Sequence, residues 1–272
     1  MAGLTKIIIA LSMTLFVMLM AMVLAIGGLG YILPPPEVRR LAFWYLNNTF
    51  NPYIPYYSAM APEAVTAIVW DFRGLDTLFE TAVFYLAIIS SVAIMRKMEL
   101  PKRFSYFGMS PIVKTVTKIT IGMILAVAAS ITLHGHLTPG GGFQGGATAA
   151  IAPLLVLVVF SVFILGKMGI NKRSMLMLRS LGLLGIGFTT FIVLLIALIY
   201  GVPAFVFQNQ PKPYAPTGLP WSIDGTLTGG TLILFNISEM FAVAAGFTII
   251  FILLAIPEEK AQEIIKGEKY GH

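Results

Sequence analysis

Cysteine is absent from this sequence and charge is scarce. None of the 272 residues is Cys, and only 11% are charged. Without thiols the chain cannot form disulfides, ligate an Fe–S cluster or hold a metal through thiolates, so any redox chemistry must belong to another protein of the same assembly. Hydrophobic residues make up 57% of the chain, and its mean hydropathy is +0.87. This composition excludes a soluble globular protein and predicts an all-α integral membrane protein.

Six apolar runs are each long enough to cross a hydrocarbon core of about 30 Å as a helix that rises about 1.5 Å per residue. The predicted spans are residues 4–33, 76–95, 112–136, 144–165, 174–200 and 227–256. The first has the basic start of a signal peptide, because Lys6 precedes its apolar run. That run exceeds the about 7–15 residues of a signal core, so we expect a retained helix.

Basic residues are distributed unevenly between the two sides that these spans define. The chain ends and the connections after the second and fourth spans hold 14 of the 18 Lys and Arg residues, with Arg179 counted among them. The other side has Arg39, Arg40, Arg73 and Lys212. The positive-inside rule therefore predicts a multi-pass protein of the cell membrane with both termini in the cytoplasm. These residues flank loops and form no continuous patch, which argues against nucleic-acid binding.

One connection, residues 34–75, is much longer than the others. It contains the run FWYLNNTFNPYIPYY, and aromatic clusters of this kind settle at the level of the lipid headgroups. We therefore expect a long interfacial loop on the outer surface between the first two spans. Residues 61–70 are expected to form a short helix with Pro62 in its first turn. The loop also divides the chain into a two-span module, residues 1–100, and a four-span module, residues 101–272.

Acidic residues occur inside two of the predicted spans. Arg73, Asp76 and Glu80 are spaced i, i+3 and i+7, so they share one helix face, and Glu80 lies about 6 Å deeper than Asp76. Glu239, in LFNISEMFAVAAG, falls about 18 Å along the last predicted span. An acid inside the membrane indicates an ion pathway. The alternatives are a cluster that only pins a helix end and a neutral acid in an interface with another protein.

The stretch HGHLTPGGGFQGG joins the third and fourth spans. We expect residues 138–142 to form the turn of a compact hairpin, in which glycines permit positive φ and let two helix backbones approach closely. The motif residues that we single out are His134, His136, Pro139, Gly140, Gly141, Gly142, Phe143, Gly145 and Gly146. His134 is expected to be structural, whereas the ordinary pKa of a histidine would suit His136 to a proton relay if it takes part in transport.

The context of this motif argues against two functions of soluble proteins. A phosphate-binding loop follows a strand and carries Lys and then Ser or Thr after its last glycine, and this stretch does neither. A metal site needs three or four ligands, whereas the motif offers two histidines two residues apart. We therefore expect no metal and no cofactor. Glycines in the fifth span, Gly182, Gly185 and Gly187, are expected to serve helix packing.

The two motifs together resemble a known family. HGHLTPGGGFQGG followed by an apolar helix resembles the MnhB family, the B-type subunits of the Mrp-type multisubunit Na+/H+ antiporters, over residues 110–256. The segment DFRGLDTLFE, residues 71–80, resembles a motif in the C-terminal membrane tail of the large A-type subunits of the same antiporters. The resemblance implies that residues 1–100 correspond to that tail and residues 101–272 to a B-type subunit. It also implies functional importance for Arg73, Glu80 and the positions near His136, namely Pro139 and Phe143.

Such a joined chain also resembles subunits of two archaeal assemblies, the membrane-bound hydrogenase and the sulfane reductase. The resemblance implies a membrane subunit that contributes to Na+/H+ translocation and is not itself an enzyme. Its implied partners are the lipid bilayer, Na+, H+, other antiporter subunits and a redox arm with Fe–S and hydrogenase-like subunits. Three alternatives stay open: a structural linker outside the ion path, a component of a standalone Na+/H+ antiporter, and an independent membrane enzyme.

Overall fold

The computed structural model describes residues 2–28, 38–95 and 109–256. They fall into two compact units divided between Trp44 and Tyr45. In the first unit, α1 (Ala2–Ala25) is a long apolar helix, and α2 (Arg40–Thr49) begins. The second unit contains the end of α2 and all the later elements, including both sequence motifs.

Six helices in the described residues are long and apolar enough to cross a membrane, which confirms the predicted number of spans. They are α1, α4 (Gly74–Ile94), α5 (Pro111–Leu133), α6 (Gly142–Val159), α8 (Lys172–Tyr200) and α9 (Thr231–Leu254). Several of their ends differ from the predicted ones by two residues or more. The predicted span 144–165 is interrupted at Ser161, which has φ 154° and caps a separate short helix, α7 (Val162–Lys167). The last span begins at Thr231, four residues later than the predicted start.

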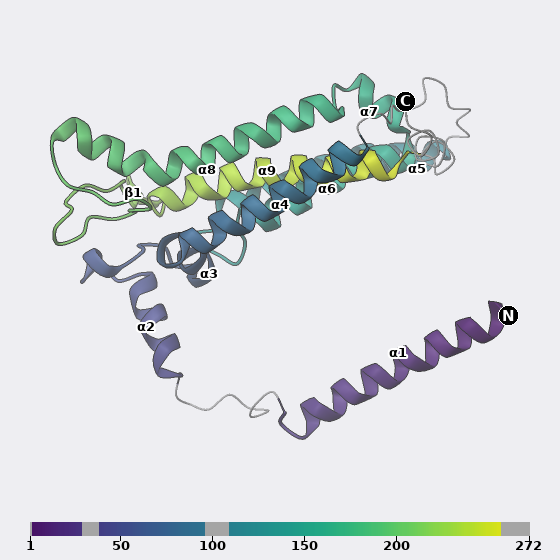
Figure 1. The fold of residues 1–272 in the computed structure, drawn as a ribbon, viewed down its shortest axis with the longest axis horizontal. Coiled ribbons are helices and arrows are strands. Elements are labelled where there is room, and N and C mark those ends of the chain that lie inside the picture. The colour runs from purple at the N-terminus through teal and green to yellow at the C-terminus, as the bar shows by residue number, and fades with distance from the viewer. Residues whose placement is uncertain (1, 29–37, 96–108, 257–272) are drawn as a thin grey trace, which may run out of the picture. The chain divides into compact units, whose positions relative to one another are not determined.

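Helix α9 is the centre of the second unit (Figure 1). It packs along α8 and α6 and more briefly against α5 and α4, and α5 packs along α6. Glycines set the close spacing of α8 and α9, because a Cβ at Gly182 would lie 2.6 Å from the Ala242 nitrogen and one at Gly185 would lie 2.6 Å from Ser238 Oγ. Gly187 has no neighbour of this kind, so the packing role predicted for it is not seen in the described chain.

The connections at one end of this bundle interlock, and we call this the hairpin end. It holds η1 (Pro55–Tyr57), α3 (Ala64–Thr66), the π-helix η2 (Ala67–Phe72) and a small antiparallel pair, β1 (Ser222–Ile223) with β2 (Thr226–Leu227). The Glu63 N–H donates to the His136 carbonyl, and the Asn209 amide donates to the Ala59 carbonyl. Segments far apart in the sequence are thereby fixed together.

The short helix predicted at residues 61–70 begins and ends later than expected. Glu63 is extended, and its carboxylate accepts a hydrogen bond from the Thr66 N–H at 2.5 Å. This is an N-cap arrangement, so the helix starts at Ala64 and Pro62 lies before it. The helical path then continues as the π-helix η2 up to Arg73.

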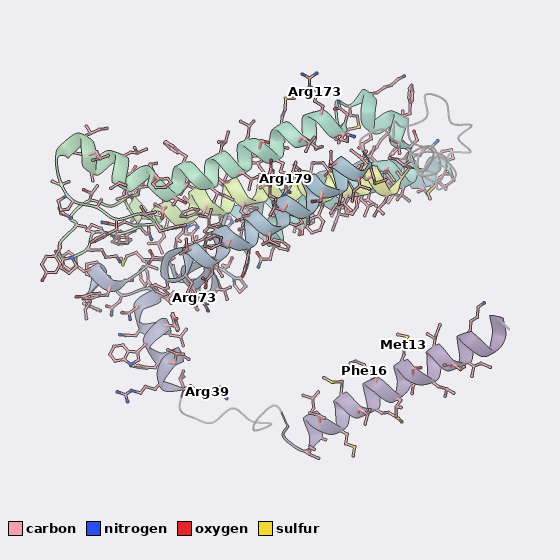
Figure 2. The ribbon with its side chains drawn as sticks, viewed as in Figure 1. Met13, Phe16, Arg39, Arg73, Arg173 and Arg179 are labelled. Atoms are coloured by element: carbon pink, nitrogen blue, oxygen red, sulfur yellow. The ribbon has the colours of Figure 1, made fainter. Side chains whose placement is uncertain are left out.

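The structure corrects the position of Arg179. The sequence placed it among the basic residues of a connection, but it lies within α8 (Figure 2) and is only 1% exposed. Its Nη1 donates to the Ala242 carbonyl at 3.2 Å, and its guanidinium lies 4.8 Å from the ring centroid of Phe84. A Cβ at Gly246 would collide with it. Arg179 therefore joins α8 to α4 and α9 through a cation–π contact and a backbone carbonyl.

A matched pair of substitutions tests the glycine packing. We expect Gly182→Leu to lower the free energy of unfolding by about 1–3 kcal/mol or more, because the leucine side chain would meet the backbone of α9. The melting temperature of the purified chain in detergent should fall accordingly. Gly187→Leu lies on the same helix in open space and should leave stability close to wild type. Equal melting temperatures for the two variants would contradict the packing described here.

Candidate functional site

The hairpin between α5 and α6 has a backbone that only glycine adopts easily. Helix α5 ends at Leu133, and His134 is its C-cap. Gly141, the residue before α6, has φ 141° and ψ −177°, a region that residues with a Cβ avoid. Helix α6 therefore starts abruptly at Gly142, and the backbone N–H of Phe143 in its first turn donates to Glu239 of α9.

Glycines also bring the start of α6 directly onto α9. A Cβ at Gly142 would lie 2.5 Å from the Asn236 carbonyl oxygen and 2.7 Å from Glu239 Oε2, and one at Gly146 would lie 2.8 Å from the Met240 carbonyl oxygen. On the neighbouring side, a Cβ at Gly145 would collide with Thr132 of α5. The glycines of the motif thus define a contact that no larger residue permits.

Glu239 lies at this contact. It is in the third turn of α9, about 12 Å from the first residue of the helix, and is only 7% exposed. Its side chain accepts hydrogen bonds from the Phe143 backbone N–H and from the Trp70 side chain. The partial positive charge at the start of α6 adds to these two donors and favours a negative charge there. Among the described residues, no Lys, Arg or His forms an ion pair with Glu239.

Trp70 reaches Glu239 from η2, in the long loop between the first two predicted spans. It is 1% exposed, and its ring stacks on Phe235 of α9 with 4.4 Å between the centroids and 4° between the planes. This stacking fixes the indole N–H toward the carboxylate one turn further along α9. The site therefore combines three segments: η2, the start of α6, and α9.

The acids of the DFRGLDTLFE motif take positions different from that of Glu239. Arg73 and Asp76 form an ion pair at the start of α4, and their side chains are 63% and 50% exposed. Glu80, about 9 Å along α4, is also exposed on the surface of the chain. It is nevertheless close enough for its charge to act on Glu239. The structure thus places Glu80 within electrostatic range of Glu239, whereas Arg73 and Asp76 compensate each other.

The two histidines of the hairpin differ in their surroundings. His134 is exposed, and its Nδ1 lies 3.1 Å from the carbonyl of Ser130 in the last turn of α5. His136 is 1% exposed, and its Nε2 donates to the Leu227 carbonyl at 2.8 Å. Burial lowers the pKa of His136 below its ordinary value of 6.5; the hydrogen bond to Leu227 opposes this shift, and His134 adds to it. At neutral pH the His136 ring is therefore uncharged and connects the hairpin to the segment before α9.

Two residues of this site escaped the sequence analysis. Trp70 appeared only as the end of a short helix, and nothing in the sequence connects it with Glu239. Asn236 precedes Glu239 by three residues in LFNISEMF, so the two share a face of α9. That spacing was a usable signal. Asn236 is 1% exposed, and neither polar atom of its carboxamide has a hydrogen-bond partner in the part of the chain that the structure describes.

Metal-binding clusters of histidine, cysteine and carboxylate side chains do not occur among the described residues. Pro139 and Phe143, the other motif positions singled out, are exposed. The Phe143 ring lies 6.5 Å from that of Phe84 and 6.1 Å from that of Phe247, measured between centroids. These rings form an apolar contact of α4, α6 and α9 close to the two glutamates.

Comparison with protein families identifies the relationship of this chain. Residues 112–249 match the family described as a domain related to the MnhB subunit of Na+/H+ antiporters. The chain belongs to this family. The matched residues run from α5 into α9 and include the hairpin, Asn236 and Glu239. The predicted family is thereby confirmed.

Two individual relatives are similar to this chain in sequence. An uncharacterized protein of Methanocaldococcus jannaschii is 26% identical over 235 residues, which cover 80% of this chain and 85% of the relative. A Staphylococcus aureus protein named as antiporter subunit mnhB2 is 26% identical over 145 residues, 53% of this chain and 93% of the relative. The second match is restricted to about half of this chain, in line with the extent of the MnhB-related domain.

Two solved structures share the fold. A chain of the membrane-bound sulfane sulfur reductase, an archaeal respiratory membrane complex, aligns with a TM-score of 0.59 and 26% identity over 91% of this chain and 97% of that chain. A chain of the Mrp complex from a Dietzia species aligns with a TM-score of 0.56 and 15% identity, over 90% of this chain and 26% of that one. This chain is a multi-pass membrane protein whose relatives include antiporter subunits and whose structural neighbours belong to multisubunit complexes.

Acid sensitivity provides a test of the neutral, buried His136. Because the pKa of His136 is lowered in the folded protein, its imidazole binds a proton more readily in the unfolded chain. The contribution of neutral His136 to folding stability is therefore fully present above about pH 6.5 and is lost as the pH falls below it. We expect the melting temperature of the wild-type chain to fall between pH 7.5 and 5.5. The fall should be smaller in His136→Gln, because the glutamine amide can still donate to the Leu227 carbonyl but does not titrate. His134→Gln, at the exposed histidine, should behave as wild type. An identical loss in His136→Gln and wild type would contradict this account.

Proposed function

We propose that this chain is a component of an Mrp-type cation/proton antiporter module and that it provides acidic groups for Na+/H+ translocation. The observation that carries the proposal is Glu239, a carboxylate inside a membrane-spanning helix that is hydrogen-bonded but has no ion-pair partner among the described residues. Keeping a charged group in an apolar bundle is energetically costly. Two hydrogen-bond donors and the start of α6 stabilise the negative charge of Glu239, so the carboxylate can bind a cation and release it again.

Glu80 gives this site a second negative charge within electrostatic range. Each charge raises the electrostatic energy of the other, and a Na+ ion or a proton between or on them relieves it. Because either cation serves, binding of one favours release of the other. This competition is the elementary step that an antiporter needs. The chain itself carries out no redox chemistry in this proposal.

The remaining candidates fit supporting roles. Arg73 and Asp76 neutralise each other at the exposed start of α4, which suits contact with headgroups or with a neighbouring protein of the complex. His136, Pro139 and the glycines of the hairpin position the start of α6 against Glu239. We assign residues 1–100 to an A-tail-like module and residues 101–272 to the B-like module, both in the cell membrane with cytoplasmic termini.

A structural linker is the alternative function, and one observation favours it. Arg73, Asp76 and Glu80 are exposed on α4, so they are available to neighbouring subunits. In this alternative the acids only hold subunits together, and neutralising them would disrupt assembly before transport.

Neutral substitutions distinguish the two functions. We expect Glu239→Gln to reduce Na+ uptake by inverted vesicles that contain the intact complex by about tenfold or more, equivalent to about 1.4 kcal/mol, with normal assembly. Glu80→Gln should reduce it as well. Asp224→Asn is the control, because Asp224 is exposed in a turn at φ 50°, which asparagine tolerates. Full transport by assembled Glu239→Gln would refute the proposal, and loss of assembly in the glutamate variants alone would favour the linker.

The parent complex is open to a direct measurement. The likeness to a chain of the sulfane sulfur reductase along nearly its whole length supports an archaeal respiratory complex with an Fe–S redox arm over a standalone antiporter. We expect mass spectrometry of the complex, purified from its native membrane in mild detergent, to identify Fe–S subunits together with antiporter subunits. Antiporter subunits without any redox protein would contradict this part of the proposal.

A further inference from the structure

Asn236 is an unusual residue for the middle of a packed helix contact. Its side chain is 1% exposed, and neither its oxygen nor its nitrogen has a hydrogen-bond partner among the described residues. The hairpin lies directly against it. A Cβ at Gly135 would be 2.8 Å from Asn236 Nδ2, and one at Gly141 would be 3.8 Å from Asn236 Oδ1. The carboxamide therefore lies between the two ends of the hairpin, on the face of α9 that also carries Glu239.

A buried amide without partners is unfavourable, and native proteins rarely retain one without a ligand, a water or a function. Asn236 is not needed to hold the hairpin, since the contacts that fix it come from elsewhere: Glu63 N–H to His136 O, Thr66 Oγ1 to Gly135 O, and His136 Nε2 to Leu227 O. Packing alone would be served as well by leucine. The polar group therefore points to a bound species.

The side chains around Asn236 limit which ligand can bind there. Glu239, three residues along, is a carboxylate with room for about four hydrogen bonds or ligand contacts, of which the Phe143 N–H and the Trp70 side chain take two. Amide and carboxylate oxygens are ligands for hard cations. One carboxylate matches a single positive charge, and metal-ligand clusters of the kind that hold divalent ions do not occur in the described residues. A proton on Glu239 would leave Asn236 unpaired.

We propose that Asn236 Oδ1 and the Glu239 carboxylate together bind a partly dehydrated Na+ ion at the start of α6. This inference rests on the proposed function and names the cation and a second ligand for the same site. Asn236 is neutral at every pH, so it distinguishes Na+ from a proton: it supplies a ligand to the metal ion and cannot itself accept the proton that Glu239 accepts.

The test is the Na+ concentration that gives half-maximal transport in vesicles containing the intact complex. Asn236→Leu keeps the approximate volume and removes the amide, and we expect it to raise this concentration by about tenfold or more, as for one lost contact to a charged group. The control is Thr248→Val on the same helix, because Thr248 is 2% exposed and its hydroxyl donates to the Ala244 carbonyl of its own helix at 2.7 Å. Thr248→Val should leave the concentration unchanged.

Two results separate this inference from the proposed function. If Glu239→Gln transports Na+ normally, both are wrong. If Glu239→Gln is inactive but Asn236→Leu has the Na+ dependence of Thr248→Val, only the Na+ ligand is wrong. If Asn236→Leu does not assemble, Asn236→Ser, whose side chain is too short to reach the ion, must show the same rise, and an unchanged Na+ dependence in that variant overturns the proposal.

A second measurement does not depend on turnover. Binding to the folded state stabilises a protein, so NaCl should raise the melting temperature of the purified complex above that in choline chloride at equal ionic strength. We expect this Na+-specific rise to be smaller in Asn236→Ser than in wild type and Thr248→Val. Equal rises in all three would overturn the assignment of Asn236 as a ligand.

Discussion

The burial of Glu239 is the constraint on which the rest of this structure depends. A carboxylate that is 7% exposed in a spanning helix must find donors inside the protein, because lipid offers none. The start of α6 offers the Phe143 N–H, and it reaches α9 only because Gly142 has no side chain. The GGGF sequence of the hairpin is thus explained by a glutamate almost a hundred residues later.

The same constraint accounts for the interlocked hairpin end. A helix start can hold a carboxylate only if it stays in place, and the hairpin is bonded on both sides. Glu63 and Thr66 fix the backbone of Gly135 and His136 from the long loop, and Leu227 fixes the His136 ring from the segment before α9. The long loop also delivers Trp70. What looks from the sequence like an interfacial connection is therefore part of the site.

Sequence reasoning predicted the spans, the family and several residues of the site, including Glu239 and Gly142, but not how these residues come together. Long apolar runs identify spanning helices because the bilayer imposes their length and composition, and the hairpin was placed correctly between α5 and α6. The burial of Arg179 depends on neighbours: Phe84, Ala242 and the absent side chain of Gly246 accommodate the guanidinium. Periodicity describes one helix at a time, so it could not bring Trp70, Gly142 and Glu239 together.

Glu239 and Glu80 differ in exposure, and this difference indicates where a cation path through the membrane would run. Glu239 faces the interior of the chain, whereas Glu80 is on the outer surface of α4, at a depth where lipid would be an unfavourable neighbour for it. A charge in that position is tolerable if another protein or water covers it, and the structural neighbours of this chain are multisubunit complexes. A path that uses both acids would then run along the boundary between α4 and a neighbouring protein of the complex. The charge of Glu80 would then be solvated only in the assembled complex. This is a physical reason for such modules to work as complexes.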